Sequence, residues 1–169
     1  MNDNEVYPVR ATRTFPGVPQ ECGAARAWAK TIVQAFPEIS DAVELVTSEL
    51  FANAVRHTAS GIPGGEVEVA VTMTGDRPEC IRLEVTDQGR RPDRPWSVPH
   101  ARMPSEDSQG GRGLFIASAL SREWGRFPVT GSGAHHLPGQ AHDRPGSMIT
   151  WAEFPVHQIE RDLELAGAS

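Results

Sequence analysis

Residues 48–58 read Ser-Glu-Leu-Phe-Ala-Asn-Ala-Val-Arg-His-Thr and place Glu49, Asn53 and His57 at intervals of four. On a helix this interval puts the three polar side chains on one face, among apolar neighbours. A carboxylate one turn from an amide oxygen sets a proton acceptor beside a ligand that hard cations prefer. The stretch therefore indicates a helix that carries an active centre for magnesium and phosphate chemistry.

The residues around this helix predict strands and helices that alternate along one domain. Strands are expected at 6–15, 66–74, 81–86, 123–127 and 147–154, and helices at 18–36, 40–58 and 113–120, with helical propensity again around 158–165. Because it contains Pro8, the first strand is expected at a sheet edge. The second and third strands flank a short turn and should pair as an antiparallel hairpin. Ser40 is the expected N-cap of the second helix.

Length and composition favour a single domain that spans residues 1–169. Apolar residues make up 38% and charged residues 22%, as in ordinary globular proteins. The net charge of −6 argues against direct nucleic-acid binding, because phosphate backbones reward clustered basic residues. No secretory signal and no apolar run of about 20 residues is visible, so we expect a cytoplasmic protein without membrane association.

Two irregular segments interrupt this pattern. The first extends from Asp87 to Gly110, is rich in proline, arginine, serine and glycine, and has no periodic run. A loop of this length in a compact domain is typical of a lid or binding element, and we place a lid at about 90–112. The second covers about 128–146 and is interpreted as an insertion.

Glycine-containing turns border the first of these segments on both sides. Asp87-Gln88-Gly89 follows a predicted strand, which is also common turn chemistry. Gly110-Gly111-Arg112-Gly113 opens a predicted helix. Such an entry presents backbone N–H groups and a positive dipole end to an anion, although many such glycines serve only close packing.

Taken in order, the polar helix and the two glycine turns resemble the N, G1 and G2 boxes of the ATPase superfamily shared by gyrase, histidine kinases and heat-shock chaperones. The closest resemblance is to the anti-sigma-factor serine kinases, whose helix motif Glu-x-x-x-Asn-Ala-x-x-His is reproduced in full at 49–57. The resemblance covers about residues 10–154. It implies an α/β (α+β) two-layer sandwich of the Bergerat type, with helices on one face of a mixed, largely antiparallel sheet.

The resemblance also implies an ATP site with named residues. Asn53 would ligate the Mg²⁺ that bridges the ATP phosphates, and Glu49 would be the general base toward an incoming hydroxyl. Asp87 would accept the adenine amino group, while Gly89 lets the base approach the backbone. These roles suit the chemistry, because a carboxylate distinguishes adenine from guanine by accepting from an exocyclic amine, and Mg²⁺ prefers oxygen ligands.

Further residues of the site follow from the same resemblance. Gly111 and Gly113 would anchor the far end of the lid around the phosphates, where Arg112 would also touch phosphate. Arg26 matches a first-helix arginine used toward the γ-phosphate or the partner, and it fits a solvated helix arginine equally well. His57 is either a residue of the nucleotide site or a favourable partner of the helix dipole.

The implied function is that of a regulator that binds Mg-ATP, phosphorylates a serine or threonine on a small antagonist protein, and sequesters a sigma factor when free. The alternative is a binding module, an ATP-dependent anti-sigma or adaptor domain that holds a partner without transferring phosphate. The family dimerises, which implies a homodimer.

Other interpretations fit the sequence less well. A dinucleotide-binding fold is rejected because the next glycine of its motif is replaced by Ile116. A metal hydrolase built on His135, His136 and His142 lacks zinc-ligand spacing. The resemblance leaves open whether Ser147, Thr150 or neither of them replaces the adenine-contacting threonine of the family.

Overall fold

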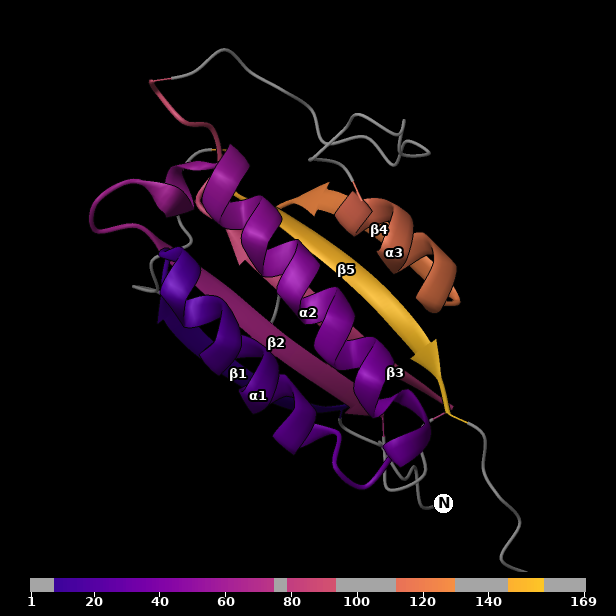
Figure 1. Cartoon of the computed structure of the whole chain (residues 1–169). Helices are drawn as coiled ribbons and strands as arrows, with labels where there is room; N and C mark the ends of the chain where they lie inside the picture. Colours follow the sequence, from indigo (N-terminus) through magenta and orange to yellow (C-terminus); the bar gives the residue numbers. More distant parts are fainter. Residues whose placement is uncertain (1–7, 75–78, 94–111, 130–145, 157–169) are drawn as a thin grey trace, which may run out of the picture.

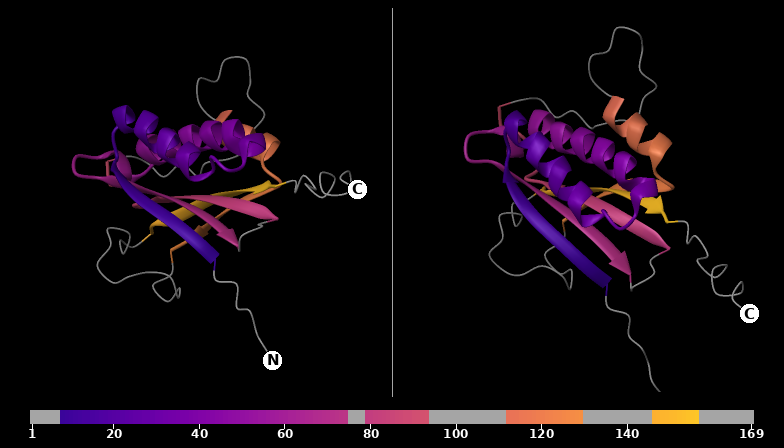
Figure 2. Two further views of the ribbon diagram at one scale, coloured as in Figure 1. Left: turned by 90° about the horizontal axis from the view of Figure 1, so that it is seen from below. Right: turned by 60° about the horizontal axis from the view of Figure 1, so that its bottom comes forward.

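The computed structural model describes residues 8–74, 79–93, 112–129 and 146–156, which form two layers (Figure 1). Its elements are β1 (Pro8–Pro16), the 3-10 turn η1 (Pro19–Glu21), α1 (Cys22–Ile32), α2 (Pro37–His57), the 3-10 turn η2 (Ala59–Gly61), β2 (Glu66–Thr74), β3 (Cys80–Asp87), α3 (Arg112–Leu120), β4 (Glu123–Pro128) and β5 (Met148–Pro155). All three α-helices lie on one face of the sheet, with α2 between α1 and α3 (Figures 1 and 2). The expected two-layer sandwich is confirmed.

The five strands follow the order β1-β2-β3-β5-β4. All four pairings between these strands are antiparallel. The sequence predicted a mixed, largely antiparallel sheet, and within the described residues every strand pair is antiparallel. The predicted hairpin is confirmed by the pairing of β2 with β3, in which Val71 lies opposite Leu83. The strand that contains Pro8 lies at a sheet edge, also as predicted.

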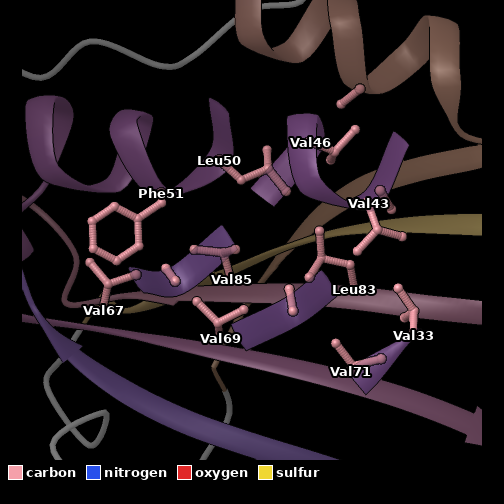
Figure 3. Packing of buried hydrophobic residues seen from close by; sticks show 14 of the residues in the cluster. Val33, Val43, Val46, Leu50, Phe51, Val67, Val69, Val71, Leu83 and Val85 are labelled. Atoms are coloured by element: carbon pink, nitrogen blue, oxygen red, sulfur yellow. The ribbon is translucent and has the colours of Figure 1, made fainter. Parts of the chain in front are cut away.

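The hydrophobic core fills the space between the helices and the sheet (Figure 3). From α2, Leu50 and Phe51 reach down onto the buried valines of β2, and Phe51 meets Phe15 of β1 edge to face, with ring centroids 6.2 Å apart. On β3, Leu83 and Val85 contribute to the same core. Because side chains alternate along a strand, the end of β3 at residue 87 continues this helix-covered face.

Two helix boundaries differ from the prediction. The segment expected to be helical from 18 to 36 forms the turn η1 and then the shorter helix α1, which ends at Ile32. The predicted N-cap Ser40 was wrong, because α2 begins three residues earlier with Pro37 in its first turn. A proline suits that position, since it has no N–H to leave unpaired and its φ is already helical. Ile39 is buried, which anchors the added turn in the core.

Several predictions lie outside the described residues. These are most of the lid, most of the 128–146 insertion with its three histidines, and the helical tendency around 158–165. Within the described ranges, no helix combines the length and the apolar character needed to cross a membrane.

Candidate functional site

The polar stripe of α2 lies on the flank that faces α3. On the opposite flank α1 packs against α2: the Cys22 thiol lies 3.5 Å from the Ser48 carbonyl oxygen, and Lys30 Nζ lies 2.6 Å from Glu44 Oε2. At 3.6 residues per turn, Glu49 is rotated about 140° around the helix from Glu44, and Asn53 about 180°. Both side chains therefore point away from α1. Helix α3 lies on that side of α2 (Figure 1).

Glu49 and Asn53 are half-buried at the border of the core. Their neighbours Leu50 and Ala54 are buried, which fixes the rotation of this part of α2. In contrast to Glu44, which pairs with Lys30, the side chains of Glu49 and Asn53 make no hydrogen bond or ion pair with another described residue. The helix thus presents a carboxylate and an amide one turn apart, both half-buried and both without a partner in the described part of the chain.

Arg26 lies on the opposite flank of α2 from this pair of side chains, whereas His57 follows Asn53 by about one helical turn. Arg26 is on α1, is exposed, and has its Nε 3.8 Å from Glu44 Oε1 on the other flank of α2. The structure therefore does not bring Arg26 together with Glu49 within one chain. His57 is the exposed last residue of α2, where a histidine interacts favourably with the helix dipole.

Hydrogen bonds tie the end of α2 to the turn that follows β3. The Ala59 N–H donates to the Gly89 carbonyl at 2.8 Å, and the Gln88 N–H donates to the buried Ser60 hydroxyl at 3.0 Å. An isolated bridge between Thr58 and Arg90 adds a further connection. These bonds hold the turn that carries Asp87 at a fixed place relative to the last two turns of α2, which carry Asn53.

The Asp87 carboxylate is buried, with 3% of the residue exposed. Its Oδ1 accepts from the Gly89 N–H at 2.7 Å, and its Oδ2 accepts from Arg126 Nη2 at 2.9 Å. The Met148 backbone N–H also donates to it. Burial raises the pKa of Asp87 above its ordinary value, and the positive charge of Arg126 together with these hydrogen bonds opposes the rise.

Gly89 has a structural reason to be glycine. Its φ is +78°, a left-handed conformation that side chains disfavour. A Cβ at this position would lie 2.7 Å from the carbonyl carbon and oxygen of Gly146 and 3.0 Å from the backbone nitrogen of Ser147. The fold therefore requires glycine where the turn crosses the start of β5, whether or not a base also approaches this backbone.

The N-terminus of α3 is directed toward the same end of the sheet. Pro128, at the end of β4, lies level with Met148, which in turn lies opposite Asp87. Only two residues separate α3 from the start of β4, so α3 begins toward the Asp87 end of the sheet. Arg112 and Gly113 occupy its first turn, whereas Gly111 lies outside the described residues.

The profile described as "Histidine kinase-like ATPase domain" matches residues 15–132. This segment covers most of the chain and contains the stripe of α2, the Asp87 turn and the start of α3. The chain belongs to the histidine kinase-like ATPase family. No curated protein matches the chain.

Membership of the histidine kinase-like ATPase family makes this chain an ATP-binding domain. The five-stranded antiparallel sheet with its single helical layer is consistent with the Bergerat fold of that family. The family match does not distinguish anti-sigma-factor kinases from other members of the family. Membership of that group stays a prediction, as do the roles of the individual site residues.

The residues around Asp87 fit the adenine end of ATP. A carboxylate offers about four acceptor positions. Among the described residues Gly89, Arg126 and Met148 occupy three of them, which leaves one for an amine hydrogen. Within the described part of the chain, two further buried polar atoms have no hydrogen-bond partner, Arg126 Nε and the Ser147 hydroxyl. Buried polar atoms without partners are uncommon, so these two are suited to a polar ligand.

Sequence reasoning missed Arg126 and left Ser147 undecided. Ser147 is buried beside Gly89, whereas Thr150, three residues later on β5, is half-buried and lies opposite Val85. Thr150 pairs with Val85 and so shares the helix-covered face of the sheet with Asp87, while Ser147 lies beside Gly89; a role of either residue at the adenine stays a prediction. The short strand expected at 123–127 was visible in the sequence, but its pairing with the last strand was not, so nothing indicated that Arg126 reaches Asp87.

Proposed function

We propose that this histidine kinase-like ATPase domain is a Mg-ATP-dependent anti-sigma-factor serine/threonine kinase. In this proposal it phosphorylates a small antagonist protein and sequesters a sigma factor when free. The main support is the half-buried Glu49, which has no partner among the residues that the structure describes and lies one helical turn from Asn53, on the flank of α2 that faces α3. This pair supplies a proton acceptor and an oxygen ligand side by side.

The reaction assigned to this site is transfer of the γ-phosphoryl group of ATP to a hydroxyl. The hydroxyl oxygen of the substrate serine or threonine forms a bond to the γ-phosphorus, the bond between that phosphorus and the β,γ-bridging oxygen breaks, and ADP leaves. Glu49 takes the hydroxyl proton as the new bond forms. Its half-buried position limits hydration of the carboxylate without burying it completely.

Positioning and charge neutralisation account for most catalysis of phosphoryl transfer. When bound, Mg²⁺ supplies neutralisation of the phosphate charge, and the Asn53 amide oxygen is the ligand assigned to it. The first turn of α3, with Arg112 and Gly113, directs its N–H groups toward the end of the sheet where Asp87 lies, and such a helix start favours an anion. Asp87 is assigned to the adenine, which is at the opposite end of the ATP molecule from the phosphates.

A kinase assay with radiolabelled ATP and a candidate antagonist protein tests the proposal. Glu49→Gln keeps the size of the side chain and removes the proton acceptor, so transfer should fall by at least about 100-fold while ATP affinity stays within about threefold. Glu44→Gln is the matched control, because Glu44 is a glutamate of the same helix on the opposite flank. Transfer by Glu49→Gln at the wild-type rate contradicts the proposal.

Tight ATP binding without transfer to any candidate antagonist would instead favour the binding-module alternative. A pull-down from the native cell with and without ATP identifies which protein changes its association with the chain. A sigma factor retained with ATP, and an antagonist that becomes phosphorylated, are the partners that the proposal expects. A homodimer is also expected, and sedimentation of the purified chain tests it.

A further inference from the structure

Arg126 places a hydrogen-bond donor next to the acceptor assigned to adenine. Its Nη2 donates to Asp87 Oδ2 at 2.9 Å, while its Nε is buried and has no hydrogen-bond partner among the described residues. We propose that Arg126 is a specificity-determining residue that donates from Nε to a ring nitrogen of the adenine. This inference rests on the ATP site described above and adds a second point of base recognition to Asp87.

The sheet register explains how Arg126 reaches this place. On β4, Arg126 lies opposite Thr150 of β5, and Thr150 lies opposite Val85 of β3. Because side chains on one face recur every two residues, Arg126 shares the helix-covered face with Val85 and Asp87. Trp124, two residues earlier on β4, packs against the core on that same face. Arg126 therefore lies on the same side of the sheet as α2 and α3.

The chemistry of the pair matches one edge of adenine. The remaining acceptor position of the Asp87 carboxylate can take one hydrogen of the exocyclic amine. In adenine, a ring nitrogen that accepts a hydrogen bond lies next to this amine on either side, so an acceptor and a donor placed side by side bind the base in a fixed orientation. Asp87 supplies the acceptor, and Arg126 Nε supplies the donor.

A guanidinium suits this task better than an ammonium group. Its donors lie in one rigid plane, and Nε and Nη2 share an edge of that plane. While Nη2 remains on Asp87, the direction of the Nε–H is set by that bond. A lysine at the same place would keep the charge beside Asp87 but would have no second donor in a fixed direction.

Calorimetric titrations with ATP, 1-deaza-ATP and 7-deaza-ATP test the inference, since each analogue replaces one ring nitrogen beside the amine by CH. The wild-type chain should bind one of the two analogues about tenfold or more weakly than ATP. Arg126→Met should bind ATP weaker by a similar factor and should no longer distinguish ATP from that analogue. Arg122→Met is the matched control, because Arg122 lies beside Cys80 at the other end of the sheet.

Arg126→Lys covers the case in which Arg126→Met does not fold, because it keeps a positive charge for Asp87. It should also bind ATP without discriminating between ATP and the analogue. Either variant that discriminates as the wild-type chain does overturns the inference, and so does a wild-type chain that binds both analogues as tightly as ATP. A wild-type chain that binds no ATP would overturn the proposed function itself.

Discussion

Arg126 and Asp87 form an ion pair between two strands that are not neighbours in the sheet, with Nη2 2.9 Å from Oδ2 across the intervening β5. The carboxylate is almost fully buried, and 23% of the arginine side chain is exposed. A buried carboxylate without a nearby cation would favour its protonated form. Arg126 therefore helps to keep Asp87 ionised, which is the form that acts only as an acceptor and binds an amine hydrogen more strongly.

The raised pKa of Asp87 predicts a specific dependence of stability on pH. Because the folded pKa lies above the unfolded value of 3.8, the folded state holds this proton more tightly. The stabilising contribution is complete below that value and is lost as pH rises through the folded pKa. Urea unfolding should show the free energy of unfolding of the wild-type chain decreasing relative to Asp87→Asn between about pH 4 and the folded pKa. A relative increase over that interval would contradict the prediction.

Removal of Arg126 should raise the pKa of Asp87 further. Its charge and its hydrogen bond both lower this pKa, and Arg126→Met eliminates both. Carboxyl carbon NMR should show the Asp87 titration midpoint moving to higher pH in Arg126→Met. The guanidinium of Arg122 lies near Cys80, so Arg122→Met should leave the titration midpoint of Asp87 unchanged. An unchanged midpoint in Arg126→Met would mean that the two groups do not interact in solution.

Recognition of adenine should depend on Asp87 itself. Asp87→Asn replaces one carboxylate oxygen by a donor, so the amine of adenine loses its charged acceptor. The affinity for ATP should fall by about 10- to 100-fold, as expected for a hydrogen bond to a charged group. Calorimetry on the folded variant measures the change, and wild-type affinity would show that Asp87 does not contact the base.

Gly89→Ala should destabilise the fold by about 2–4 kcal/mol, because it combines an unfavourable positive φ with a clash against backbone. The added Cβ would meet the Gly146 carbonyl group at 2.7 Å. Gly23→Ala is the matched control, since nothing lies within 4 Å of its Cβ position on α1. That change should stabilise the chain by up to about 1 kcal/mol through helix propensity. Urea unfolding that gave equal effects for the two substitutions would refute this reading of Gly89.

The link between α2 and β3 predicts an effect at Ser60. Ser60→Ala removes the acceptor of the buried Gln88 N–H, which should cost about 1–3 kcal/mol of unfolding free energy. The same change should weaken ATP binding, although Ser60 is not assigned to contact the nucleotide, because the Asp87 turn loses an anchor to α2. Ser48→Ala removes only a bond to the Glu44 carbonyl within the helix and should change stability by less than about 0.5 kcal/mol.

Local sequence patterns predicted much of this fold because they report local geometry. The alternation in 66–74 and 81–86 identified the hairpin, and the interval of four from Glu49 to Asn53 identified a helix face. Boundaries were predicted less well. Ser40 has a side chain suited to capping, but Pro37 and the buried Ile39 extend the helix past it, and that burial depends on tertiary packing that the sequence does not display.

Site residues that lie in one continuous segment could be predicted from the sequence. Site residues that come together from distant segments could not. The position of Asp87 and Gly89 at the end of a strand was predicted from the sequence, and their role at the adenine stays a prediction. Arg126 was not identified, because its role depends on β5 lying between β3 and β4, an order in the sheet that differs from the order in the sequence. Ser60 was missed for the same reason, since its partner Gln88 is 28 residues away.

Asn53→Ala tests the assignment of Asn53 as a Mg²⁺ ligand without disturbing the fold. Asn53 is half-buried and its side chain has no partner among the described residues, so the unfolding free energy should change by less than about 1 kcal/mol. Mg-ATP binding should be abolished, because the variant lacks the amide oxygen that we assign as a ligand of the cation. Calorimetry with and without Mg²⁺ measures the effect, and Ser48→Ala, on the α1 flank of the same helix, is the control. Unaltered Mg-dependent affinity in a folded Asn53→Ala chain would place the cation elsewhere.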